Sequence, residues 1–280
     1  MQFRIRPWPT WVWIVCFSAL FVLAFRGRLF GLWNLWWTHG LSSVGALIPP
    51  VSATLIWRKR KKLEAMPLES SAAGLIPVFL ATAGASTLPS TGLLFATYWG
   101  GVALALGGFR LLRELIFPLA LLLFVVPIPL TILNILDYPL QMLTAQITAD
   151  VAASVGLPVI QQGPTLSLPN AQIFIAPACN GLRSVAALFL IALVASHISQ
   201  GPPWARTLLP VIGIGLAYAS NLLRLLLNVI VTNALGSSSW LEYEQTYDLT
   251  IGFLVFVIAC IGFSKITTWL KCRPVFASVA

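Results

Sequence analysis

The chain has 280 residues, of which 58% are hydrophobic and only 9% are charged, and its mean hydropathy is +0.89. Soluble domains carry about 25% charged residues, so this composition excludes a soluble globular protein and indicates a polytopic membrane protein. The formal net charge is +9. Because the basic residues form short clusters between apolar spans, this charge bears on membrane topology and argues against nucleic-acid binding.

The sequence predicts one all-α integral membrane domain over residues 1–280, with about eight transmembrane helices of roughly 20 residues each. The N-terminal MQFRIRPWPT leads into an apolar run without a small-residue cleavage site, so no cleaved signal peptide is expected. The aromatic stretch LFGLWNLWW, after the first span, is predicted to lie at the membrane interface. The predicted spans are Trp11–Phe25, Leu41–Trp57, Ala72–Ala83, Gly92–Gly108, Leu115–Leu136, a span that starts at Cys179, Thr207–Leu235 and Leu249–Leu270.

Basic residues orient these spans, because cytoplasmic loops are enriched in Lys and Arg. The strongest signal is the run Arg58–Lys62 after the second span. With this run in the cytoplasm, both termini are cytoplasmic and Cys179 lies at the outer mouth of the sixth span. The protein is therefore expected in the cytoplasmic membrane with an outward-facing site. The residues that fall outside are Arg26, Arg28, Asp137, Asp150, Glu242, Glu244 and Asp248.

The only long predicted extramembrane segment is about Asp137 to Ala176. Its first part spaces apolar residues at helical intervals, which indicates an amphipathic helix on or against the membrane. Those residues are Leu140, Leu143, Ile147, Val151 and Val155. Its second part alternates apolar and polar residues around Gly163 and Asn170, which predicts a short hairpin. The hairpin either positions the mouth of the next helix or merely connects the two spans.

The stretch from Ile175 to Leu193 combines a thiol and a cation at the start of an apolar span. Pro177 precedes it and no further Pro follows, so a helix is predicted to begin near Cys179. Residues four apart share a helix face, so Arg183 would lie beside Cys179 and favour the nucleophilic thiolate. An arginine in an apolar span costs about 2.5–3.5 kcal/mol, which makes it a functional candidate. A snorkelling Arg beside a small buried Cys is the structural alternative.

The other three cysteines have no such setting. Cys16 and Cys260 lie in apolar spans, and Cys272 follows Lys271. Each is predicted to be a buried or cytoplasmic thiol outside any disulfide framework. No group of Cys and His has metal-ligand spacing, so neither a metal nor another cofactor is expected.

A second intramembrane cation lies in the seventh span. Asn221, Arg224 and Asn228 fall at i, i+3 and i+7, which places one polar stripe on an apolar helix. Arg224 lies roughly 16 Å along the helix from its outer end, so it could reach Cys179 or pair with an acid. A structural arginine that donates to carbonyls between helices is the alternative.

Several motifs together resemble the exosortase/archaeosortase family. They are FPLALLLFVVPIP, YPLQ, GLPV, a Gly and a Leu-Pro pair, PACNGLRS, and NLLR in the following span, spread over about Pro118 to Phe256. An exosortase-like core over about 115–270 follows from this resemblance. It implies Cys179 as the nucleophile and Arg183 and Arg224 as its cationic partners, supported by Asn180, Asn221 and Asn228.

The sequence departs from the family pattern at one position. The family has a His in the arrangement His-x-x-x-Gly-x-x-x-Phe, and Gly252 and Phe256 fit its end. The His position falls on Asp248, or on Tyr247 if the spacing slips by one. A carboxylate can accept the thiol proton, so Asp248, Glu244 or Glu242 is the candidate base. His39 is a further candidate on the outer side, whereas His197 lies about 27 Å along the helix from Cys179.

The resemblance implies a cysteine-dependent protease or transpeptidase that cleaves C-terminal sorting signals of exported proteins, linked to exopolysaccharide or surface-protein assembly. Its expected partners are the lipid bilayer and the sorting-signal helix of a secreted substrate, and the sequence sets no oligomeric state. A catalytically inactive relative is the first alternative. A non-enzymatic scaffold or carrier is the second, although a carrier would be expected to show repeat symmetry, which the sequence lacks.

Overall fold

The computed structural model describes residues 10–38, 42–67, 69–126, 130–169 and 171–274, without the side chains of 10, 130–134, 178, 235–245 and 273–274. The chain is mostly helical and divides into two compact units, residues 1–129 and 130–280, which are described in turn. Three described helical segments are long and apolar enough to cross a membrane: Trp11–Thr38, Pro203–Ala234 and Thr246–Trp269. The last two agree with the predicted seventh and eighth spans. The total of about eight spans stays a prediction.

The first unit consists of helices alone among its described residues. In chain order they are α1 (Thr10–Thr38), η1 (Ser42–Leu47), α2 (Ile48–Arg58), α3 (Arg60–Glu64), η2 (Ala72–Gly74), α4 (Leu75–Ala83), α5 (Thr91–Leu121) and η3 (Leu122–Val125). Helix α1 continues through LFGLWNLWW, which the sequence analysis placed outside the first span. The stretch contains no Pro, so nothing in it ends the helix.

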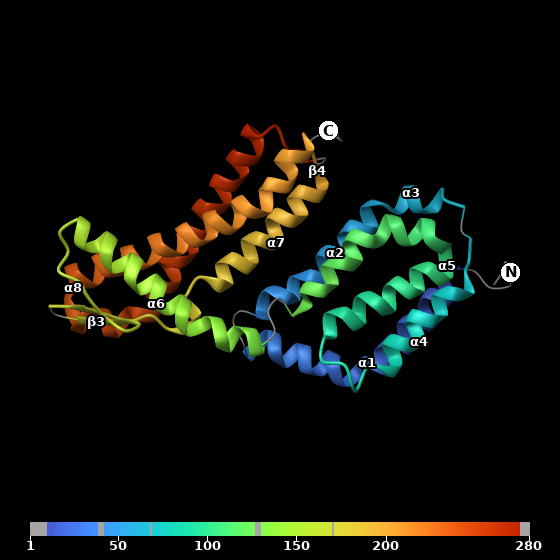
Figure 1. Ribbon diagram of the computed structural model, residues 1–280, viewed down its shortest axis with the longest axis horizontal. Coiled ribbons are helices and arrows are strands. Elements are labelled where there is room, and N and C mark those ends of the chain that lie inside the picture. The colour runs from blue at the N-terminus through green and yellow to red at the C-terminus, as the bar shows by residue number, and fades with distance from the viewer. Residues whose placement is uncertain (1–9, 39–41, 68, 127–129, 170, 275–280) are drawn as a thin grey trace. The chain divides into compact units, whose positions relative to one another are not determined.

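Helix α5 is two helical halves joined at Gly108. This residue has φ +67°, and a Cβ there would lie 2.5 Å from the Glu69 carbonyl oxygen, so only Gly fits the turn. The two halves lie side by side (Figure 1). Gly100 of the first half is so close to the second that a Cβ there would lie 3.7 Å from the Leu112 side chain. The predicted fifth span, Leu115–Leu136, was expected to be interrupted by Pro118, Pro127 and Pro129, and the structure divides it: the helical run ends at Val125 and α6 begins at Leu130.

The turn between α4 and α5 is tied to α1 by Arg28. The guanidinium donates to the carbonyls of Ala85 and Leu88, and its Nη1 lies 3.1 Å from the Thr91 hydroxyl. These acceptors satisfy each of its three nitrogens. Arg28 therefore has the surroundings of a structural arginine.

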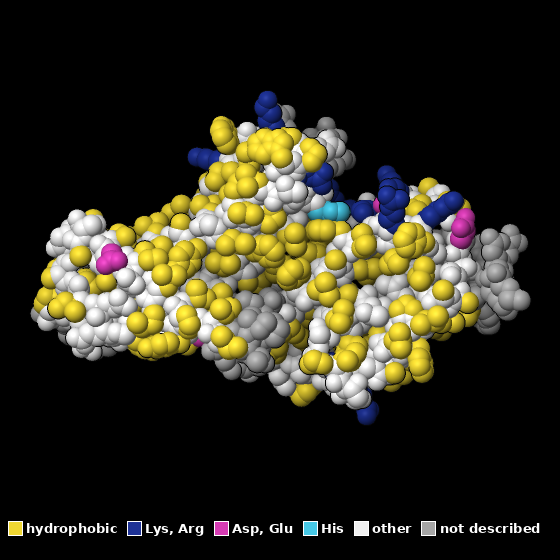
Figure 2. Space-filling model, viewed as in Figure 1, with side chains coloured by type: hydrophobic (Ala, Val, Ile, Leu, Met, Phe, Trp, Pro, Cys, Tyr) yellow, Lys and Arg dark blue, Asp and Glu magenta, His cyan; other side chains and the backbone are white. Residues whose placement is uncertain are grey.

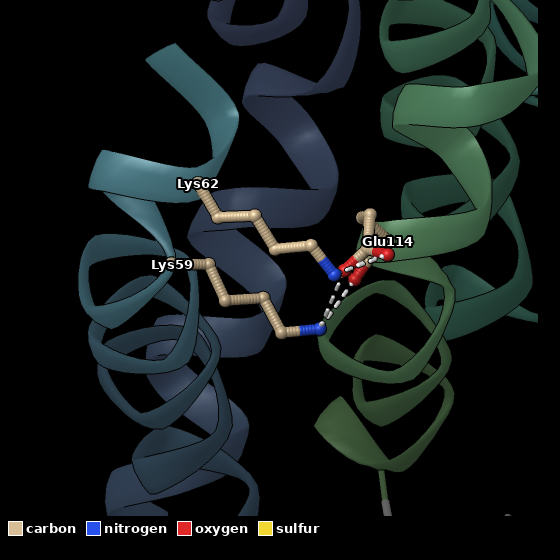
Figure 3. Close-up of polar contacts among 3 residues, drawn as sticks. All are labelled: Lys59, Lys62 and Glu114. Carbon is tan, nitrogen blue, oxygen red and sulfur yellow. Dashed lines mark hydrogen bonds and ion pairs between the residues drawn. The ribbon is translucent and has the colours of Figure 1, made fainter. Parts of the chain in front are cut away.

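One end of the first unit is basic. Lys59, between α2 and α3, and Lys62 of α3 point toward Glu114 of α5, and Lys62 Nζ lies 2.7 Å from its carboxylate (Figure 3). The hydrogen bond and charge of Lys62 hold the pKa of Glu114 below its usual value. Lys and Arg side chains gather over α3, whereas hydrophobic side chains cover much of the remaining visible face (Figure 2). This segregation fits a polar end outside an apolar membrane region.

The second unit comprises α6 (Leu130–Ser154), β1 (Ile160–Gln162), β2 (Thr165–Leu168), β3 (Ala171–Phe174), η4 (Pro177–Cys179), α7 (Leu182–Ile198), β4 (Ser199–Gln200), α8 (Pro203–Trp269) and β5 (Arg273–Pro274). The two limbs of α8, Pro203–Ala234 and Thr246–Trp269, run side by side, and α7 packs against them (Figure 1). Strands β4 and β5 pair at the end of this bundle.

The segment between the fifth and sixth predicted spans forms α6 and a three-stranded antiparallel sheet of order β1-β2-β3. The sheet turns at Gly163 as predicted, and β2 and β3 pair on either side of Asn170, which lies outside the described residues. The packed face of α6 consists of small and polar residues, including Ala145, Thr148 and Ala152, while Leu143 and Val151 are exposed. Three residues of the predicted apolar stripe, Leu143, Val151 and Val155, are thus exposed, as a helix against lipid requires, whereas Leu140 and Ile147 are half-buried.

Candidate active site

Cys179 lies at the end of a short connection between the sheet and α7. Pro177 opens the single turn η4, and Cys179 is its last residue. Gly181 then adopts φ +89°, and α7 starts at Leu182. A Cβ at Gly181 would lie 3.0 Å from the Asn221 side chain, so this turn requires Gly both for its conformation and for its space. The predicted helix start near Cys179 is therefore wrong by three residues.

Arg183 was predicted to lie beside the Cys179 thiol and to act on it, but it is not among the groups that shift the pKa of that thiol. The prediction assumed one continuous helix from Cys179, in which residues four apart share a face. The turn at Gly181 breaks that helix, and Arg183 lies exposed in the first turn of α7. The cation that acts on Cys179 comes instead from α8, through Arg224.

The first limb of α8 presents a polar stripe to the Cys179 connection. The Asn221 amide donates to the Cys179 carbonyl at 3.0 Å, and Asn221 is only 3% exposed. The Arg224 guanidinium, one turn further on, interacts with the Cys179 thiol through charge and a hydrogen bond. Because these two residues are spaced i, i+3, as predicted, Asn221 holds the backbone of Cys179 while Arg224 interacts with its sulfur.

Asp248 enters the same cluster from the second limb of α8. Its Oδ1 lies 3.5 Å from Arg224 Nε and accepts a hydrogen bond of 2.7 Å from the Asn228 amide. One turn after Asp248, Gly252 packs on Arg224, where a Cβ would lie 3.1 Å from its Cδ. Gly252 therefore leaves room for the guanidinium between the two limbs.

Burial dominates the ionisation of the Cys179 thiol, which lies before α7 and outside the apolar helices. Burial raises the pKa of this thiol above its usual value, the Arg224 charge lowers it and the Asp248 charge raises it. The net pKa shift is upward. The expectation of a preformed thiolate is therefore wrong, and deprotonation requires a base or the arrival of substrate.

Arg224 and Asn228 keep polar atoms that the described residues do not satisfy. Arg224 Nε and Nη2 and Asn228 Oδ1 are buried and have no hydrogen-bond partner within the described ranges. Leaving such a group unpaired costs about 1–3 kcal/mol, more for a charged one. Two unpaired N–H donors beside a thiol form a site for an anionic or carbonyl oxygen.

A second set of hydrogen bonds fixes Asn180, the residue after the thiol. Its side-chain NH₂ donates to Asp137 Oδ1 of α6 at 2.7 Å, and its side-chain Oδ1 accepts from the Leu182 N–H at 3.0 Å. Asn180 is only 2% exposed. Asn180 thereby satisfies an N–H at the start of α7. Asp137 was not among the predicted site residues, although a lone acid in an apolar stretch is a usable signal.

Of the remaining candidates, the structure describes the side chains of Tyr247 and His197. Tyr247 is half-buried beside Asp248, and His197 lies in the last turn of α7. His39 falls outside the described residues, as do the side chains of Glu242 and Glu244. Among described residues, no group of three His, Cys, Asp or Glu is placed to hold a metal ion.

The family model described as transmembrane exosortase (Exosortase_EpsH) matches residues 36–264. No curated protein and no solved structure matches the chain. The matched range covers most of the chain and contains Cys179, Arg224 and Asp248.

Proposed function

Because the chain belongs to the transmembrane exosortase family, we propose that it is a cysteine transpeptidase or protease that cleaves C-terminal sorting signals at the outer face of the cytoplasmic membrane. One observation carries the proposal. A thiol, a guanidinium and a carboxylate from η4 and both limbs of α8 interact with one another, and two of the guanidinium nitrogens lack a hydrogen-bond partner among the described residues. These are the parts that covalent catalysis with a cysteine requires.

The first step transfers a proton and forms a carbon–sulfur bond. The thiol is neutral at rest because burial raises its pKa, so Asp248 accepts its proton as the thiolate attacks the scissile carbonyl carbon. The contacts of Asp248 with Arg224 and Asn228 both use Oδ1, which leaves Oδ2 for the proton. The carbonyl oxygen becomes an oxyanion, and the Arg224 N–H groups stabilise it.

The second step breaks the peptide bond. The carbon–nitrogen bond cleaves, the leaving amine takes the proton from Asp248, and the acyl group remains on Cys179 as a thioester. An incoming amine or water then attacks the thioester carbonyl and returns the proton to the sulfur. Asp248 takes the place of the family's His in both transfers.

Thioester trapping tests this function directly. The chain is expressed with an exported reporter that ends in a short motif, a transmembrane helix and a basic tail taken from the same genome. We expect a covalent adduct of enzyme and reporter that neutral hydroxylamine cleaves, and its loss in Cys179→Ala but not in Cys16→Ala. A processed reporter in the Cys179→Ala strain contradicts the proposal.

The outward position of the site has a separate test. Tags inserted at Gly163 and at Arg60 are probed with an impermeant reagent before and after the membrane is opened. We expect the Gly163 tag to react in intact cells and the Arg60 tag only after opening, because the basic run orients the chain. Two tags on the same side contradict this topology.

A further inference from the structure

The three-stranded sheet of the second unit has one open edge that leads to Cys179. Because the strand order is β1-β2-β3, β3 has a strand neighbour on one side only in the part of the chain that the structure describes. One face of the sheet packs on α6 and α8 through residues such as Leu166 and Ile173. The other face is exposed and carries Ile160 at one edge and Phe174, which is 58% exposed, at the other.

The register decides which backbone groups of β3 face the open edge. The Ile175 N–H donates to the Pro164 carbonyl at 2.9 Å, and antiparallel pairs alternate between bonded and non-bonded positions. Ala171 and Ile173 therefore bond to β2. The N–H and C=O groups of Gln172 and Phe174 point away from it, and both residues are exposed. Such groups are a template for an added strand.

The course of the chain after β3 sets the direction of that strand. The five residues after Phe174 end at Cys179 and span at most about 17 Å when fully extended. Helix α7 follows from Leu182. A sorting signal has the same order of parts: an extended motif, a cleavage point and a helix. Only a strand parallel to β3 brings the motif to the edge, the cleavage point to the thiol and the following helix into the direction of α7.

We infer that the short motif of the substrate adds to β3 as a parallel fourth strand, bonded to the backbone of Gln172 and Phe174, and that this pairing delivers the scissile peptide to Cys179. The inference rests on the proposed function and names how its substrate is held. Backbone pairing gives affinity for an extended segment whatever its side chains. Phe174 then contacts the motif on the exposed face of the sheet.

A proline at position 172 tests the pairing. Gln172→Pro removes an N–H that points to the open edge and none that bonds to β2, so the sheet is retained. We expect about tenfold or greater loss of kcat/KM for the reporter tail. The reason is that one backbone hydrogen bond to the added strand is lost and the proline ring clashes with that strand. Gln172→Ala, which keeps the N–H, stays within about threefold of the parent. The alkylation rate of Cys179 by a small thiol reagent is the same in all three proteins.

Photocrosslinking supplies a second measurement that does not depend on turnover. Benzoylphenylalanine replaces Phe174 or Ile160 in the Cys179→Ala protein, and the reporter tail is added. We expect position 174 to crosslink to the motif residues before the scissile bond, and position 160, exposed at the opposite edge, to give no crosslink there.

The outcomes separate the inference from the proposed function. Cys179-dependent processing that is equal in Gln172→Pro and Gln172→Ala, or crosslinks from position 160 alone, overturns the added strand and leaves the enzyme intact. No Cys179-dependent processing in the parent protein overturns both. A Gln172→Pro protein with altered Cys179 alkylation is judged by the crosslinks alone.

Discussion

Arg28 and Arg224 both lie in apolar helices of this protein, and their surroundings differ. Arg28 of α1 donates from all three nitrogens to neutral oxygens of the α4–α5 turn. Arg224 of α8 interacts with a thiol and a carboxylate, and two of its buried nitrogens lack a hydrogen-bond partner among the described residues. A satisfied guanidinium stabilises a fold, whereas an unsatisfied one holds donors for a ligand at a cost in stability. We therefore expect substitutions at Arg224 to reduce activity and substitutions at Arg28 to reduce stability.

The largest expected effect lies at the thiol that distinguishes the Arg224 region. Cys179→Ala is expected to reduce reporter processing by at least about 10⁴-fold, because no other described nucleophile replaces the sulfur. The matched control is Cys260→Ala, which removes a half-buried thiol of α8, away from η4, and leaves the rate unchanged. Processing in the Cys179→Ala protein would place the chemistry outside this cluster.

The acid beside Arg224 has no counterpart beside Arg28. Asp248→Asn keeps the size and the acceptor oxygen but removes the base, so a loss of about 10²–10⁴-fold in single-turnover rate is expected. Asp248→His restores the family pattern and is expected to recover part of that rate. If Asp248→Asn leaves the rate unchanged, the proton goes to another group.

The two arginines themselves give the most direct comparison. Arg224→Lys keeps the charge but loses the planar set of donors, so kcat falls by about 10²–10³-fold with little change in thermal stability. Arg28→Lys has the opposite result: thermal stability in detergent falls, and the activity of the folded fraction is unchanged. Equal effects of the two substitutions on activity would erase the distinction between them.

The smallest expected effect is a shift in the pH dependence of Cys179 alkylation. Burial raises the pKa of the thiol and Arg224 opposes that rise, so the rate increases with pH through a midpoint above the usual thiol value. Arg224→Gln removes the opposing charge and moves the midpoint further up. Arg28→Gln leaves it in place. A midpoint that moves down in Arg224→Gln contradicts the assigned contact.

The sequence predicted what depends on local pattern. Hydropathy located both limbs of α8, and alternation located the strands around Gly163. The i, i+3 spacing of Asn221 and Arg224 correctly put both on one side of a helix. Composition alone also showed that the chain is a membrane protein.

The sequence could not predict partners that meet through tertiary packing. Arg183 was placed beside Cys179 because nothing local showed that Gly181 would adopt a positive φ and end the turn. Asp137 was missed because its partner, Asn180, lies 43 residues away. The upward pKa shift of Cys179 was missed for the same reason, since burial by neighbouring segments outweighs a nearby charge.

The contacts of Arg28 also have a consequence for biosynthesis. Its acceptors lie 57 to 63 residues later in the chain, in the turn that precedes α5. At about 5–20 residues per second, the ribosome needs roughly 3–13 s to supply them after it has made Arg28. During that interval α1 carries a guanidinium whose final acceptors do not yet exist. The nascent α1 must therefore keep Arg28 hydrated, or held by the insertion machinery, until the α4–α5 turn arrives.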